Sequence, residues 1–172
     1  MRKVYLGMSG VVLLAVLAQF YFAAFGAFSI PRDHASFEMH SVNGMIVIPL
    51  ASLLTTVVAA LARAPGRLIG LAAAPFGLVV VQILIFVVVH LVTEMTMEQS
   101  TPGAQWILGL HALNGLAVVS VALLGVVRAR RFVRAASAET AHATKVVTLT
   151  AVESGSRPPA ATAPAESSGV TV

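Results

Sequence analysis

The stretch His40-Ser41-Val42-Asn43-Gly44 occurs a second time, with the same polar spacing, as His111-Ala112-Leu113-Asn114-Gly115. In both stretches a histidine stands three residues before an asparagine and four before a glycine, and these are the only two asparagines in the chain. Each stretch opens an apolar run. Random placement would rarely give this coincidence, so the sequence predicts a duplicated helix pair.

The composition around these stretches is that of a membrane protein. Hydrophobic residues make up 58% of the 172 positions and charged residues 10%, against about 45–50% and 25% in soluble proteins. Sustained apolar runs, each near the roughly 20 residues that a membrane-spanning helix needs, cover residues 4–28, 39–62, 68–92 and 104–127. They are continuous instead of alternating, which excludes a β-barrel. We predict an all-α, transmembrane up-down four-helix bundle built from the duplicated pair.

The charged residues flank the spans and indicate topology. If the spans alternate, one side of the membrane holds Arg2, Lys3, Arg63, Arg67, Arg128, Arg130, Arg131 and Arg134. The opposite loops hold the remaining basic residue near the spans and several acids, namely Arg32, Asp33, Glu38, Glu94 and Glu98. By the positive-inside rule we expect a multi-pass protein of the bacterial plasma membrane with both termini cytoplasmic. The net charge of +4 therefore indicates no nucleic-acid partner.

The character of the chain changes after the fourth run. Residues 1–135 hold the expected four-helix transmembrane domain, which ends in the basic cluster. Residues 136–172 are rich in Ala, Thr, Ser and Pro and contain too few large apolar side chains to form a core. We expect a disordered cytoplasmic tail, for which a helical start stays open.

Three features of the spans and their connections indicate how the helices bend and pack. Gln19 and Gln82 lie near the middle of the first and third spans, where an interhelical hydrogen bond is the first interpretation and a place in a ligand pocket the second. Pro49 predicts a kink in the second span. The short turn at residues 62–67 makes the second and third helices antiparallel neighbours.

The repeated stretch also carries the candidate chemistry. Residues three and four apart share a helix face, and the second and fourth helices of an up-down bundle are diagonal, so the two histidines should face each other near the outer leaflet. A glycine one turn inward leaves room for a flat group. This arrangement suits haem b with two neutral imidazoles as iron ligands. The candidate cofactor-binding residues are His40, His111, His90, Asn43, Asn114, Gly44 and Gly115, with His40 and His111 on the haem iron and no catalytic residue assigned.

Two considerations keep other interpretations open. There are 23 residues from His40 to Arg63 but 17 from His111 to Arg128, so if both arginines mark one depth, the histidines differ by about 9 Å of helix rise. Taking Arg130 as the anchor reduces the difference to four residues. The histidines and asparagines can instead serve helix packing, without any cofactor. His90 could be a third ligand, a propionate partner or a partner of Glu94.

In general architecture, the bundle and its histidines resemble four-helix membrane haem b proteins, such as cytochrome b561-like electron carriers and haem A synthase halves. That resemblance implies haem binding between helices. Over residues 1–130 the chain also resembles the uncharacterised families of small four-helix membrane proteins from high-GC bacteria, through the His-x-x-x-Gly strips His40 to Gly44 and His111 to Gly115.

Other function classes lack their residues. The chain has no cysteine, nucleotide-binding loop or HExxH string, and no carboxylate lies one or two turns inward from either repeated histidine, which disfavours a zinc enzyme. No acid lies in a span core, which disfavours a proton-coupled carrier. The sequence therefore favours a non-enzymatic protein that contacts the lipid bilayer. A homo-oligomer or a membrane partner protein stays open.

Overall fold

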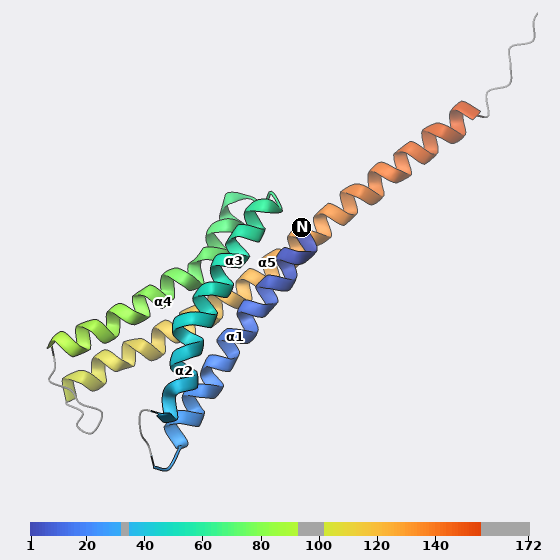
Figure 1. The fold of residues 1–172 in the computed structure, drawn as a ribbon. Helices are drawn as coiled ribbons and strands as arrows, with labels where there is room; N and C mark the ends of the chain where they lie inside the picture. Colours follow the sequence, from blue (N-terminus) through green and yellow to red (C-terminus); the bar gives the residue numbers. More distant parts are fainter. Residues whose placement is uncertain (32–34, 93–101, 156–172) are drawn as a thin grey trace, which may run out of the picture. The chain divides into compact units, whose positions relative to one another are not determined.

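The computed structural model describes residues 1–31, 35–92 and 102–155. Over these residues the chain is helical throughout and contains no strand, so the predicted all-α class is confirmed. Figure 1 shows the helices in their order along the chain, which is α1 (Arg2–Phe28), α2 (Glu38–Val42), α3 (Ile48–Leu61), α4 (Gly66–Val92) and α5 (Pro102–Gly155). A 3-10 turn, η1 (Ala35–Phe37), precedes α2, and a π-helical turn, η2 (Asn43–Val47), joins α2 to α3.

The predicted four spans are confirmed. The helical stretches long and apolar enough to cross a membrane are Arg2–Phe28, Ala35–Leu61, Gly66–Val92 and Gln105–Thr150. Large apolar side chains such as Leu14, Leu54 and Leu84 are between about half and two-thirds exposed on the outside of these helices. In water such a surface would drive aggregation, whereas in a bilayer it faces lipid. The protein is therefore an integral membrane protein.

The second span is interrupted at the place where Pro49 predicts a kink. Pro49 lies in the first turn of α3, directly after the π-helical turn Asn43–Val47. Proline has no N–H to donate to the carbonyl four residues earlier, and its ring crowds that carbonyl. A widened turn before the proline accommodates both effects. The irregular turn thus includes Asn43 and Gly44 of the repeated stretch.

Successive spans run antiparallel, as Figure 1 shows for residues 1–135, with α2 and α3 running in the same direction as parts of the second span. The α3–α4 turn is the tightest connection, and in it Arg63 adopts a left-handed backbone conformation with φ of 54°. The N–H groups of Arg63 and Ala64 donate to the carbonyls of Ala60 and Ala59, which ends α3. The prediction that the second and third helices are antiparallel neighbours is confirmed.

All four spans contribute to two layers of core. The layer nearer the repeated stretches consists of Val12, Val16, Ile48, Ala51, Val79, Val118 and Ala122. The layer at the other end of the spans consists of Tyr5, Ala59, Ala62, Ala64, Ala72 and Ala129. Alanines dominate this second layer, and small side chains let helices approach closely in a membrane.

Ser52 joins α3 to α4 at a second proline. Pro75 lies inside α4 and cannot donate a backbone hydrogen bond. The hydroxyl of Ser52 donates to the carbonyl of Ala72 at 2.7 Å and accepts from the N–H of Phe76 at 3.3 Å. Ser52 is fully buried, so this hydroxyl satisfies backbone groups next to the proline and links the two helices.

The chain divides into the units Met1–Ala135 and Ala136–Val172. The second unit begins as helix, because α5 continues to Gly155. Residues 156–172 of the expected disordered tail lie outside the described residues, as do the loop charges Arg32, Asp33, Glu94 and Glu98.

Candidate functional site

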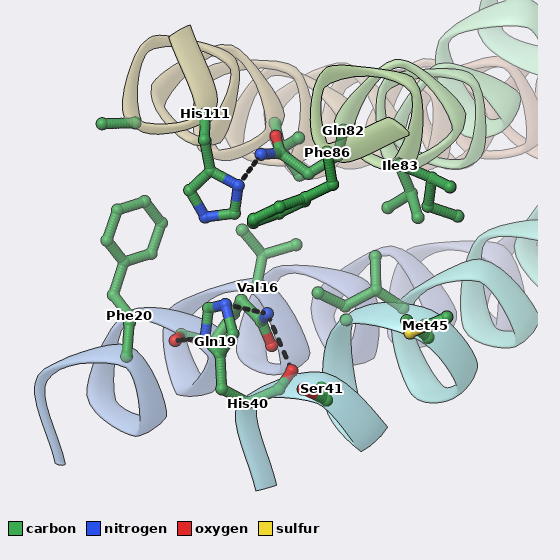
Figure 2. A pocket seen from close by; sticks show the side chains of 17 residues that line it. Val16, Gln19, Phe20, His40, Ser41, Met45, Gln82, Ile83, Phe86 and His111 are labelled. Atoms are coloured by element: carbon green, nitrogen blue, oxygen red, sulfur yellow. Dashed lines mark hydrogen bonds between the residues drawn. The ribbon is translucent and has the colours of Figure 1, made fainter. Parts of the chain in front are cut away.

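A cavity of about 550 Å³ lies in the four-helix unit, in the half where α1 ends and α2 begins. Residues from α1, the second span, α4 and α5 line it (Figure 2), and most of the lining is apolar. The lining side chains that bear on its chemistry are Gln19, Phe20, His40, Gln82, Phe86 and His111. Both histidines of the repeated stretch therefore reach one cavity.

On one side of the cavity, α1 is joined to the second span by a set of polar contacts. Asn43 Nδ2 donates to the carbonyl of Ala15 at 2.8 Å and to Gln19 Oε1 at 2.7 Å. Gln19 Nε2 donates to the carbonyl of His40 at 2.9 Å and to His40 Nε2 at 3.2 Å. His40 Nδ1 donates to the carbonyl of Gln19 at 3.2 Å. These contacts hold the imidazole of His40 at both ring nitrogens.

On the other side, α4 is joined to α5 by the corresponding contacts. Asn114 Nδ2 donates to the carbonyl of Leu78 at 2.9 Å and to Gln82 Oε1. Gln82 Nε2 in turn donates to His111 Nδ1. Ala15 and Leu78 each stand four residues before their glutamine. The two helix pairs therefore share the carbonyl–asparagine–glutamine contacts, but the glutamine amide donates to Nε2 of His40 and to Nδ1 of His111.

The two imidazoles approach each other across the cavity (Figure 2). Their ring centres are 6.0 Å apart and their planes are inclined by 48°. The ring of Phe86 packs edge-on against His111, with 4.9 Å between centres. The expectation that the two histidines face each other is thus met in the structure.

The depth offset inferred from the arginines, about 9 Å of helix rise, does not keep the two imidazoles apart, because their ring centres are 6.0 Å from each other. α5 does not end at Arg128 but continues to Gly155. Ala129 packs in the same core layer as Ala62. Because Ala62 directly precedes Arg63 and Ala129 directly precedes Arg130, this shared layer agrees with Arg130 as the counterpart of Arg63 and with an offset of four residues between the histidines.

The two glycines lie in different surroundings, although both line the cavity. A Cβ on Gly44 would stand 2.6 Å from Gln19 Nε2, whereas a Cβ on Gly115 would make ordinary contact with Phe20 at 3.5 Å. Gly44 is therefore required for the close approach of the Gln19 amide. Asn43 and Asn114 are not among the lining residues. They hold the glutamine side chains that line the cavity by donating hydrogen bonds to them.

His90 is not brought to the cavity. It is exposed near the end of α4 and is absent from the lining. Glu94, its suggested partner, lies outside the described residues. Across the described ranges no three His, Cys, Asp or Glu side chains come close enough together to hold a metal ion.

Sequence reasoning under-weighted the glutamines and missed the aromatic residues. Gln19 and Gln82 line the cavity and contact the histidines directly, and their alignment within the repeat was the available signal. Phe20 follows Gln19 directly, while Phe86 stands one turn after Gln82. Because these aromatic residues occupy different places in the two halves, the repeat gave no indication of them.

Residues 19–89 match the model of a family of unknown function (DUF6220). The matched segment begins at Gln19 and includes His40 and Gln82, but it ends before His111. Over this segment the chain is similar to an uncharacterised family, in line with the resemblance stated from sequence. No curated protein and no solved structure matches the chain.

Proposed function

We propose that the cavity binds haem b, that His40 and His111 would hold its iron, and that the protein transfers electrons or handles haem within the membrane. The observation that carries the proposal is the spacing of the two imidazoles, whose ring centres are 6.0 Å apart. With metal–nitrogen bonds of about 2 Å and about 1.1 Å from nitrogen to ring centre, two imidazoles on opposite sides of one metal have centres about 6 Å apart. The spacing therefore fits bis-imidazole ligation.

The surroundings of His40 support the same ligand. Metal-binding histidines usually donate the second ring N–H to a carbonyl or carboxylate, which fixes the ring. His40 Nδ1 donates to the carbonyl of Gln19 in this way, leaving Nε2 with its lone pair. The cavity volume of about 550 Å³ falls within the range of roughly 300–1,000 Å³ that is typical of cofactor pockets.

Haem iron would supply one-electron redox chemistry. The residues of this chain would hold the two imidazole rings, surround the porphyrin with apolar side chains and keep water away. Phe20 and Phe86 line the cavity for the last two roles. Exclusion of water and the identity of the axial ligands are the means by which a protein sets the potential of such a centre.

We further propose that the cavity lies toward the outer face and that both termini are cytoplasmic. The cavity is at the end of the spans where α1 finishes and α2 starts. Arg2, Arg63 and Arg67 lie at the opposite ends of their helices. Basic residues of this kind stay on the cytoplasmic side. Tagging each terminus and testing its accessibility in intact cells would check this orientation.

The test of haem binding is a visible absorption spectrum of the purified full-length protein in detergent, with and without added haemin. We expect a Soret band with the features of a low-spin, six-coordinate haem. The His40→Ala/His111→Ala double variant should lose the band, whereas His90→Ala, which removes a histidine outside the cavity, should keep it. A protein that shows no Soret band after haemin is added would refute the proposal.

A second candidate is a non-enzymatic structural or accessory membrane protein whose histidines serve helix packing. The observation that favours it is the completeness of the polar contacts, because every fully buried side-chain nitrogen and oxygen in the described residues has a hydrogen-bond partner. This alternative predicts that the double histidine variant unfolds more easily in detergent and that the wild-type protein acquires no chromophore.

A further inference from the structure

We infer that His40 and His111 are unequal ligands: His40 is the firm one and His111 the displaceable one, so that the His111 side admits a small exogenous ligand such as a diatomic molecule. The inference rests on the proposed haem binding and concerns which side of the site opens. It follows from the direction of the hydrogen bonds, which places the ring proton on different nitrogens in the two histidines.

The proton on His40 is assigned through backbone carbonyls, which can only accept. His40 Nδ1 lies 3.2 Å from the carbonyl of Gln19, so Nδ1 carries the proton. Gln19 Nε2 donates to His40 Nε2, so Nε2 has the lone pair. When a metal takes this lone pair, the bond from Gln19 Nε2 to His40 Nε2 is given up, but no ring proton has to move. The Gln19 amide keeps its bond of 2.9 Å to the carbonyl of His40.

The proton on His111 is assigned by the same logic and falls on the other nitrogen. Asn114 Nδ2 must donate to the carbonyl of Leu78, and it also donates to Gln82 Oε1. The remaining atom of the Gln82 amide is Nε2, which donates to His111 Nδ1. His111 therefore carries its proton on Nε2, the nitrogen that points across the cavity in Figure 2.

Ligation by His111 through Nε2 thus has a cost that ligation by His40 lacks. The proton would have to move to Nδ1, where the N–H of Gln82 already points. Gln82 would then have to turn its amide so that Oε1 accepts from Nδ1–H, and the bond from Asn114 would be lost because two amide nitrogens would face each other. The loss of one interhelical hydrogen bond in a membrane, together with the move of the proton, corresponds to a weakening of His111 ligation by about threefold or more.

The same proton makes His111 useful once it has left the metal. Its Nε2–H becomes a hydrogen-bond donor on the side that has opened, and such a donor favours a small ligand that develops partial negative charge. Carbon monoxide on the reduced protein and cyanide on the oxidised protein are the probes that fit this side. We expect either probe to displace His111 and to leave His40 in place.

The test uses the full chain loaded with haemin, and it compares the two single histidine variants. His111→Ala should retain the Soret band, change from low to high spin and bind carbon monoxide at least about threefold more tightly. His40→Ala should lose much more haem affinity than His111→Ala. Equal haem loss in the two variants, or stronger loss in His111→Ala, would overturn the inference while leaving haem binding intact.

Two variants that keep both histidines give an independent readout. Gln82→Met removes the amide that fixes the proton on His111, so His111 should ligate more strongly and carbon monoxide affinity should fall about threefold or more. Gln19→Met, the matched change in the other helix pair, should alter it less than about twofold. Helical content by circular dichroism shows that each variant is folded. Equal effects of the two variants contradict the assignment, and a wild-type protein without a Soret band refutes the proposed function and the inference together.

Discussion

Replacing Gly44 by alanine tests the hydrogen bonds that join α1 to the second span. A Cβ at this position would stand 2.6 Å from Gln19 Nε2 and 3.4 Å from Gln19 Cδ. The amide of Gln19 must therefore move. It donates to the carbonyl of His40 at 2.9 Å and accepts from Asn43 at 2.7 Å, so both bonds are lost when it moves.

Gly115 provides the matched control, because its Cβ would meet only Phe20 Cζ at an ordinary 3.5 Å. Both substitutions gain up to about 1 kcal/mol from the higher helix propensity of alanine, and this gain cancels when the two variants are compared. Two interhelical hydrogen bonds in a membrane are worth about 0.6–2 kcal/mol each. Gly44→Ala should therefore be less stable than Gly115→Ala by about 1 to 4 kcal/mol.

The measurement is the free energy of unfolding in mixed detergent micelles, obtained by titration with a denaturing detergent and followed by circular dichroism. The comparison needs only the wild-type protein and the two alanine variants. If Gly44→Ala is as stable as Gly115→Ala, the Gln19 amide does not hold the two helices together and the description of this side of the cavity is wrong.

Two further predictions concern the scaffold. Ser52→Ala should lower the free energy of unfolding by about 1–3 kcal/mol, because a fully buried hydroxyl that bridges α3 and α4 is removed. The control is Ser120→Ala, which removes an exposed hydroxyl that bonds only its own helix and should change the free energy of unfolding by less than about 0.5 kcal/mol. Equal effects of the two substitutions would contradict the bridge between α3 and α4. Arg63→Gly should raise the free energy of unfolding by about 1 kcal/mol, because glycine adopts the left-handed conformation without strain. Arg67→Gly removes the same charge inside α4 and should lower it by about 0.5–1 kcal/mol, so a gain in both variants would point to charge instead of backbone strain.

Part of the candidate site could be predicted from the sequence because its residues recur at a fixed spacing. His40 and His111 share the pattern with Asn43 and Asn114, and residues on one helix face move together when helices pack. Which other residues line the cavity could not be predicted, because the depth and direction of a side chain depend on local helix geometry. The π-helical turn at Asn43–Val47 changes that geometry in one helix pair only.

The sequence by itself determined the membrane environment, the number of spans and their alternation. These depend on the length of the apolar runs and on the position of charges along the chain, which are local properties. Only the tertiary structure decided that Gln19 and Gln82 contact the histidines, that Gly44 makes room for an amide and that His90 stays outside the cavity. These facts depend on distances between helices, which arise when side chains from different spans pack against one another.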